Sequence, residues 1–258
     1  MIFVKSEDLK YGMRLAKPIY NKTGVLLYER NTRLTLQGIE SVKNFGLLGL
    51  YILEPAEPVP PMTEEDLDFE RFQTMAVFSI REELDNIIAG REPVNLKRLA
   101  NAIITNYGRL DHKITFTQNL RSTTDYVYKH VINTAILCAL ISAQVYYTPT
   151  EQEELVLAAL LHDIGKLLLP NKVREKYDDY DTNDLIIVKK IQNDGLGLLR
   201  PEIGIDSGVR RIVAQIHRME YGNSNLEQGK ILKSTKILKV ANLFDTMTCM
   251  KISEEAIS

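Results

Sequence analysis

Apolar residues recur every three or four positions along most of the chain after residue 63, and this spacing is typical of amphipathic helices that bury one face. The first such helix is expected to bury Phe69, Phe72, Ala76, Ile80, Leu84 and Ile87. Further helices are expected at 94–107, 126–147, 183–193, 207–219 and 232–250. Another helix is expected to begin at Thr150, with Glu153 completing a capping box, and to lead up to His162. The pattern therefore predicts an all-α bundle over residues 63–258.

Residues 1–60 show a different pattern, in which short apolar runs alternate with turns. The expected elements are strands at 25–28 and 50–53 and a helix at 36–44 that Thr35 caps. A stiff proline-rich linker ends at about residue 62. The predicted fold is thus mainly α, with a helical bundle preceded by a small α+β domain. The small domain carries no catalytic constellation, so we expect a structural or docking module that could recruit protein partners.

The composition narrows the possibilities mainly by exclusion. The 258-residue chain is 45% apolar and 26% charged, as in ordinary globular proteins. Its formal net charge of −2 argues against a DNA-binding protein. The two cysteines, Cys138 and Cys249, match no zinc or redox spacing, and the first residues turn acidic too early for a secretory signal, so a reduced cytoplasmic protein is expected. No apolar run approaches the ~20 residues of a membrane span. Long amphipathic helices often pair between two copies of a chain, so a homodimer is also possible.

The candidate chemistry is concentrated in a short segment at the end of one apolar run. His162 and Asp163 offer a divalent metal two different donors, and Lys166 places a cation beside them. His130 lies upstream, on another expected helix. Three metal ligands and a fixed lysine suit phosphate-ester chemistry, in which a metal activates water and the cation steadies the phosphoryl oxygens.

Four motifs make a more specific comparison possible. They are Asp-Tyr-Val-Tyr-Lys-His-Val-Ile-Asn at 125–133, His-Asp-Ile-Gly-Lys at 162–166, Pro-Glu-Ile-Gly at 201–204 and Ala-Asn-Leu-Phe-Asp-Thr-Met-Thr at 241–248. In order and spacing they resemble the HD-GYP family, the branch of HD-superfamily phosphohydrolases that hydrolyses cyclic di-GMP. The resemblance covers roughly residues 65–250. It implies an α-helical fold, a metal centre of two or three ions, often iron or manganese, and a cyclic dinucleotide substrate.

The resemblance also implies roles for individual residues. His130, His162 and Asp163 match metal-ligand positions of the family, and Lys166 matches the lysine that contacts the scissile phosphate. Asp163 and Lys166 are accordingly the candidate catalytic residues of an active phosphodiesterase. The small N-terminal domain is similar to one that often precedes such domains.

Other positions depart from the family pattern. Arg200 stands where the family has a histidine ligand, and Asn242 stands where it has the final aspartate ligand. Asp245, one turn later, matches a second acidic position and not that ligand. The Gly-Tyr-Pro signature is absent, and of the histidine pair that precedes it at most His217 remains.

These departures leave few donors for a pair of ions. Loss of even an indirect partner commonly lowers metal affinity ~10–100-fold, so the loss of a carboxylate ligand at Asn242 should cost at least that. Two like unit charges about 4 Å apart repel each other by about 4 kcal/mol at an effective dielectric of ~20. A divalent ion roughly doubles this repulsion, so an inward-pointing guanidinium of Arg200 would oppose a second metal ion. We therefore expect either no metal or one weakly held divalent ion, iron, manganese or another. Its expected ligands are His130, His162, Asp163 and Asn242.

The same departures suggest a hypothesis about the ligand. Arg200, Lys166 and Arg218 could form a cationic cradle for phosphate, with His217 beside it, because guanidinium groups bind phosphate oxygens without a metal. The chain would then be a degenerate HD-GYP protein that binds a cyclic dinucleotide or another phosphate ligand, with little or no phosphodiesterase activity. The alternatives are an active metal-dependent phosphodiesterase and a protein-interaction module with a collapsed pocket. An arginine on a helix face ordinarily points to solvent instead.

Overall fold

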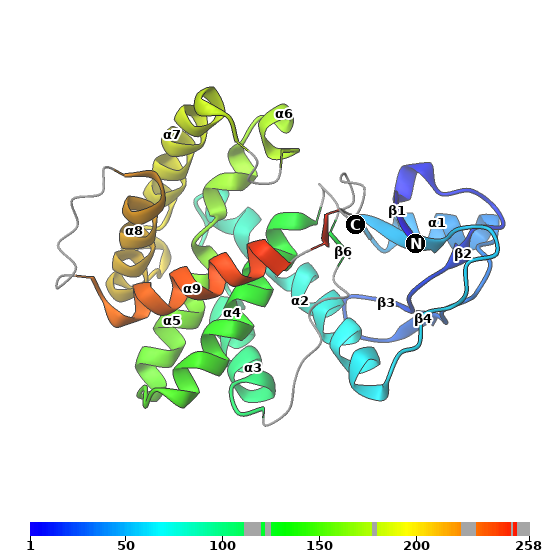
Figure 1. The fold of residues 1–258 in the computed structure, drawn as a ribbon, viewed down its shortest axis with the longest axis horizontal. Coiled ribbons are helices and arrows are strands. Elements are labelled where there is room, and N and C mark those ends of the chain that lie inside the picture. The colour runs from blue at the N-terminus through cyan, green and yellow to red at the C-terminus, as the bar shows by residue number, and fades with distance from the viewer. Residues whose placement is uncertain (111–119, 122–124, 177–179, 223–230, 249, 252–258) are drawn as a thin grey trace. The chain divides into compact units, whose positions relative to one another are not determined.

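A computed structural model describes residues 1–110, 120–121, 125–176, 180–222, 231–248 and 250–251 (Figure 1). The chain divides into two compact units, and each is described by itself. The first unit comprises Met1–Phe78, Thr117–Asp125 and Met250–Ser258, and the second comprises Ser79–Phe116 and Tyr126–Cys249. Helix α2 (Glu64–Ile88) begins in the first unit and ends in the second, so the compact units divide inside a helix and not at the proline-rich segment.

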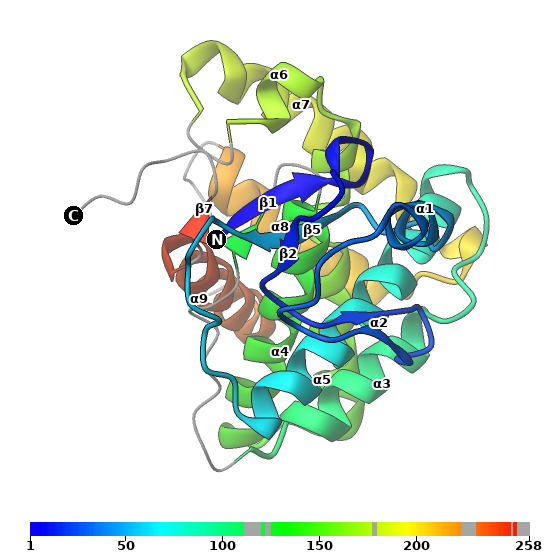
Figure 2. The ribbon, with the colours of Figure 1, turned by 90° about the vertical axis from the view of Figure 1, so that its right-hand side faces the viewer.

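The first unit is a small α+β module. Its elements are β1 (Ile2–Lys5), η1 (Ser6–Asp8), β2 (Arg14–Leu15), β3 (Ile19–Tyr20), β4 (Leu26–Tyr28), α1 (Leu36–Asn44) and β5 (Gly49–Leu53). Strand β5 lies between β1 and β2 in an antiparallel sheet (Figure 2), and β3 pairs with β4. Thr35 caps α1 as expected, since its hydroxyl oxygen accepts from the Gly38 N–H at 3.0 Å. Leu15, Leu34 and Val42 are buried in its core.

Two short strands complete this unit. They are β6 (Leu120–Arg121) and β7 (Met250–Lys251), which pair in parallel. The residues on either side of β6, and those after β7, lie outside the described part of the chain, as does Cys249.

The second unit is helical, which confirms a mainly α fold. After α2 its elements are α3 (Leu96–Tyr107), α4 (Tyr126–Gln144), α5 (Pro149–Leu161), η3 (Ile164–Leu168), α6 (Asn171–Arg174), α7 (Thr182–Leu198), η4 (Pro201–Ile203), α8 (Ser207–Tyr221) and α9 (Lys233–Thr248). Helix α4 lies in the middle of this unit, where it packs against α3, α5 and α9 (Figure 1).

Helix α4 is also long and apolar enough to cross a membrane by length and composition. Within the helical unit, however, 72% of its most apolar window is buried. That burial is typical of the core helix of a globular bundle, and it explains why α4 is apolar on every side.

The start of α5 corrects the sequence prediction. The N-cap is Thr148 and not Thr150: its hydroxyl accepts from the Glu151 N–H, and the Glu151 carboxylate accepts from the Thr148 N–H at 2.9 Å. Pro149 is the first helical residue. A proline fits there because its missing N–H would have no partner within the helix, so the capping box begins two residues earlier than expected.

Two glycines bring α7 close to the turn that follows α5. A Cβ built on Gly195 would lie 2.6 Å from the Cα of Gly165, which is closer than real Cβ contacts allow. The backbones of α7 and η3 therefore touch without an intervening side chain, and Gln192 of α7 reaches Asp163. Gly197, on the same helix, has nothing within 4 Å of its Cβ position.

We predict that Gly195→Ala and Gly197→Ala have opposite effects on stability. Gly195→Ala should lower the free energy of unfolding by about 1–3 kcal/mol, because the methyl group overpacks the contact with Gly165. Gly197→Ala should be neutral or raise it by up to ~1 kcal/mol, because alanine favours the helix. Urea denaturation of both variants measures the difference, and equal stabilities would contradict the close approach of α7 and η3.

Candidate metal site

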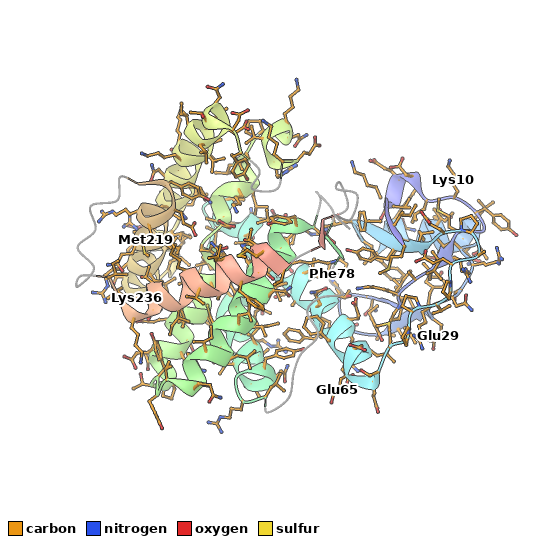
Figure 3. The ribbon with its side chains drawn as sticks, viewed as in Figure 1. Lys10, Glu29, Glu65, Phe78, Met219 and Lys236 are labelled. Carbon is orange, nitrogen blue, oxygen red and sulfur yellow. The ribbon has the colours of Figure 1, made fainter. Side chains whose placement is uncertain are left out.

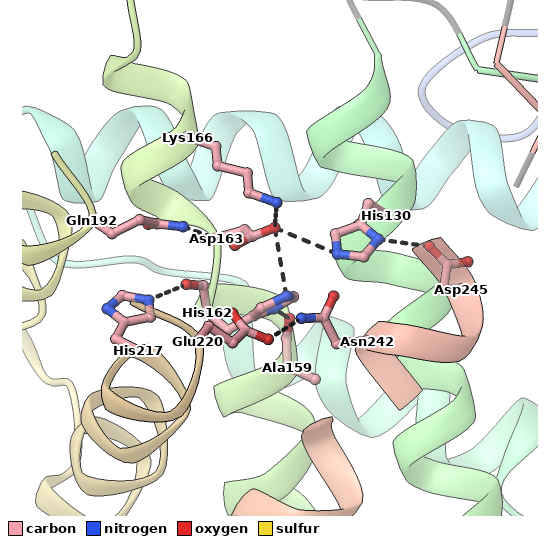
Figure 4. A network of polar contacts seen from close by, with 10 residues as sticks. All are labelled: His130, Ala159, His162, Asp163, Lys166, Gln192, His217, Glu220, Asn242 and Asp245. Carbon is pink, nitrogen blue, oxygen red and sulfur yellow. Dashed lines mark hydrogen bonds and ion pairs between the residues drawn. The ribbon is translucent and has the colours of Figure 1, made fainter. Parts of the chain in front are cut away.

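Three potential metal ligands meet at the centre of the helical unit. His130 comes from α4, and His162 and Asp163 lie where α5 passes into η3 (Figure 4). All three side chains are buried, and one donor atom of each lies within 4.8 Å of the others. Asp163 Oδ2 is 3.4 Å from His130 Nε2 and 3.6 Å from His162 Nε2.

The second nitrogen of each imidazole fixes the tautomer. His162 Nδ1 lies 2.8 Å from the Ala159 carbonyl oxygen, and His130 Nδ1 lies 2.6 Å from Asp245 Oδ2. A carbonyl oxygen and a carboxylate only accept hydrogen bonds, so Nδ1 carries the proton in both rings. Neither Nε2 atom makes a hydrogen bond to the protein, and in the neutral ring each presents a lone pair.

The charges of the cluster follow from burial and from Lys166. Burial lowers the pKa of His162 to about 4, so this imidazole is neutral at pH 7. Burial alone would raise the pKa of Asp163, but the adjacent Lys166 ammonium opposes that effect, and the pKa lies well below its ordinary value. Lys166 Nζ lies 2.8 Å from Asp163 Oδ2, and Gln192 Nε2 donates to Oδ1 at 2.9 Å. Asp163 is thus a carboxylate.

This donor set fits a single divalent ion. When both imidazoles are neutral, their Nε2 lone pairs point toward an anionic oxygen, and such an arrangement is repulsive unless a cation lies among the three atoms. Metal-binding histidines ordinarily donate their other N–H to a carboxylate or a backbone carbonyl, as His130 and His162 do here. Two imidazoles and a carboxylate suit iron, manganese and zinc alike.

Asn242, the fourth expected ligand, is turned partly to another residue. Its amide nitrogen donates to Glu220 Oε1 at 2.6 Å, which leaves only its carbonyl oxygen for a metal. Burial, together with the charge of Asp163, raises the pKa of Glu220 to about 7. Near pH 7 Glu220 is therefore partly protonated. Together Glu220 and Asn242 offer a metal less negative charge than two carboxylates would.

His217 of α8 lies next to the cluster without joining it. Its Nε2 lies 2.6 Å from the backbone carbonyl oxygen of His162 and donates to it. Burial lowers the pKa of His217, so the imidazole is neutral and its buried Nδ1 makes no hydrogen bond to the protein. His217 thus holds the backbone that carries His162.

The three expected cations differ in how far they are buried. Lys166 is buried against Asp163. Arg200 is exposed between α7 and η4, and its Nη2 lies 3.7 Å from the Cβ position of Gly90. Arg218 is exposed on α8. Both guanidinium groups thus keep their hydration, which an interior position without a paired anion would remove. Of the three residues expected in the cradle, Lys166 is the one that contacts Asp163.

Two residues that position the cluster carry little sequence signal for that role. Asp245 is the only acidic residue of α9 and lies among apolar residues. This pattern indicates that it faces inward, but not that it contacts His130. Gln192 lies among polar residues of α7, and nothing in its neighbourhood distinguishes it from a surface side chain. Only the packing of α7 on η3 shows that it supports Asp163.

A comparison with protein families agrees with this geometry. The family model for the HD domain matches residues 127–247. The match supports a place in the HD superfamily of phosphohydrolases, whose members usually bind divalent metals. A search of curated proteins finds no match, and neither does a search of solved structures.

We predict a pH-dependent stability that comes from Glu220. Its pKa rises from about 4.5 in the unfolded chain to about 7 in the folded one, so its protonated form contributes stability that is complete below pH ~4.5 and is lost as the pH rises to ~7. Relative to Glu220→Gln, the wild type should lose on the order of 1–3 kcal/mol over that window.

Urea denaturation at several pH values, in the presence of a chelator, measures this difference. Glu202→Gln, at an exposed position, controls for the loss of one carboxylate. A constant difference between wild type and Glu220→Gln from pH 4.5 to 8 would contradict the prediction.

Proposed function

We propose that this chain is a degenerate HD-GYP protein of the cytoplasm that holds one divalent metal ion and binds a phosphate-bearing ligand, most plainly a cyclic dinucleotide such as cyclic di-GMP. In this proposal the protein serves in signalling as a ligand-binding or regulatory domain, with little or no phosphodiesterase activity. One observation carries it: the Nε2 atoms of His130 and His162 face the Asp163 carboxylate without a hydrogen-bond partner, and a hydrogen bond at the other ring nitrogen fixes each ring.

The neighbouring residues support one ion over two. His217 spends its Nε2–H on a backbone carbonyl, and Asn242 spends its amide nitrogen on Glu220. Arg200 and Arg218 are exposed and provide no donor atoms for a metal. Among the described residues, the one group of histidine and carboxylate donors close enough to share an ion is therefore the buried set of His130, His162 and Asp163.

Lys166 supports the choice of a phosphate ligand. A divalent ion in this place would act as a Lewis acid toward a phosphoryl oxygen. Lys166 is buried with its ammonium group 2.8 Å from Asp163, so a positive charge is held next to the carboxylate of the cluster. An ammonium group has three N–H donors, and a phosphate oxygen that enters the site can accept a hydrogen bond from it.

An active phosphohydrolase is the second candidate, and a specific observation favours it. Glu220 has a pKa of about 7, which is suitable for transferring a proton near neutral pH. In that case Asp163 and Lys166 would be catalytic residues beside the ion. The third candidate, an interaction module whose pocket is filled by Arg200, loses support because that side chain is exposed.

We predict that Mn²⁺ binds with a stoichiometry of one per chain. His162→Ala should abolish binding, because it removes a donor. Asp245→Asn should weaken binding by ~10–100-fold, because the amide no longer enforces the Nδ1–H tautomer of His130. Calorimetric titration of the chelator-treated protein measures both, with Asp194→Asn on the exposed side of α7 as the control. Two ions per chain, or unchanged affinity in Asp245→Asn, would contradict a single site of this design.

We predict that cyclic di-GMP binding depends on Lys166 and not on Arg200. Lys166→Met should weaken binding at least ~10-fold, because a charge-assisted hydrogen bond to phosphate is worth roughly 1.5–3 kcal/mol. Arg200→Ala, at an exposed position, should bind as the wild type does. Calorimetry with Mn²⁺ present tests this, and an assay with bis-nitrophenyl phosphate separates the candidates. Rapid Mn²⁺-dependent hydrolysis would favour the active enzyme, and absence of cyclic di-GMP binding would reject the cyclic-dinucleotide ligand.

A further inference from the structure

Helix α9 exposes a continuous apolar stripe on its outer face. Val240, Leu243, Phe244 and Met247 are 60%, 55%, 50% and 75% exposed. Their spacing of three and four residues places them side by side along one side of the helix. Together they expose on the order of 400 Å², which is the size of the largest apolar patch on a typical monomer, and such a patch is often functional.

The opposite face of α9 is already used by the bundle. Thr235, Ile237, Leu238, Ala241 and Asp245 are buried. This face packs against α4, α5 and α8, and its Asp245 holds His130. The helix is therefore apolar on two faces, although the helical unit covers only one of them. A helix with that pattern is expected between two layers, so the outer face lacks a partner within this unit.

The charges near the stripe indicate what such a partner carries. Lys233 and Lys236 (labelled in Figure 3) are exposed at the start of α9 and continue the line of the stripe at the same spacing, and Lys239 is half-buried. Lys233 Nζ donates to the Val145 carbonyl oxygen at 2.8 Å and lies 4.9 Å from the centre of the Tyr147 ring, so this ammonium group is held at the start of the stripe with further N–H donors for an acidic partner. Within Lys233–Thr248, all of which the structure describes, the only acidic residue is the buried Asp245. The exposed line thus begins basic and ends apolar.

We propose that this face of α9 docks an amphipathic helix of another protein, with acidic residues at one end and large apolar residues at the other. One helix lying along the stripe would pair its acidic end with Lys233 and Lys236 and bury its apolar end on Leu243 and Met247. The proposal does not depend on metal or nucleotide binding.

Two other occupants fit this face less well. A second copy of α9 running antiparallel could pair the two apolar halves, but the lysines at each start would then lie beyond the overlap. An anionic membrane is best matched by a helix whose basic residues flank the apolar stripe along its whole length, whereas here the two kinds of residue are separated along the axis.

Synthetic peptides can test the proposal with the full chain. The probe is a fluorescent amphipathic peptide of about 20 residues with glutamates at one end and leucines at the other, and its match replaces the glutamates by lysines. Fluorescence anisotropy should show at least tenfold tighter binding of the acidic peptide. Leu243→Glu should abolish binding, and Lys233→Glu with Lys236→Glu should reverse the preference between the peptides. Ile186→Glu, at a 66% exposed position of α7, should bind as the wild type does.

Leu243 is exposed, so its replacement should leave the fold intact, and urea denaturation of the same variant checks this independently. No binding of the acidic peptide, or equal binding of both peptides, would overturn the proposal. Two further results would also overturn it. In the first, the wild type forms a concentration-dependent dimer by light scattering and Leu243→Glu abolishes it. In the second, the wild type sediments with vesicles of phosphatidylcholine and phosphatidylglycerol and Leu243→Glu does not. Failure of the Mn²⁺ or cyclic di-GMP predictions would leave the peptide result standing.

Discussion

The buried carboxylate of Asp163 is the group around which the helical unit is arranged. An anion in the interior is costly unless it is paired. Here Lys166 of η3 and Gln192 of α7 pair with it, and α4 and the end of α5 bring two imidazoles close to it. Lysine and glutamine satisfy part of the carboxylate. The two imidazoles satisfy none of it without a cation, because each presents a lone pair. That unbalanced side is the physical basis for expecting a metal.

Helix ends and close packing place these groups within reach of one another. The end of α5 lets His162 bond back to Ala159, and the contact between Gly165 and Gly195 lets α7 bring Gln192 to Asp163. Helix α9 adds Asp245 from its inner face while its outer face stays apolar and exposed. One helix thus orients a candidate metal ligand and presents the proposed docking surface.

On the side of the site formed by α8 and α9, the polar side chains form hydrogen bonds within the protein. Asn242 is satisfied by Glu220, and His217 by a backbone carbonyl. The bond of His217 occupies one of its ring nitrogens, and the raised pKa of Glu220 removes negative charge from the same region. This side of the cluster therefore offers less negative charge than the side of Asp163.

The sequence by itself determined the helical class, the order of most elements and the identity of the buried triad. Helical periodicity is local, and a histidine beside an aspartate at the end of an apolar run has few other uses. The sequence does not determine where each helix begins. A proline usually breaks a helix, so Pro149 favours a cap at Thr150, whereas in the structure Pro149 is the first residue of α5. The roles of Asp245 and Gln192, and the outward direction of Arg200, were decided only by tertiary structure. These depend on which helix faces meet, and residues far apart in the chain record no sign of that contact in their local pattern.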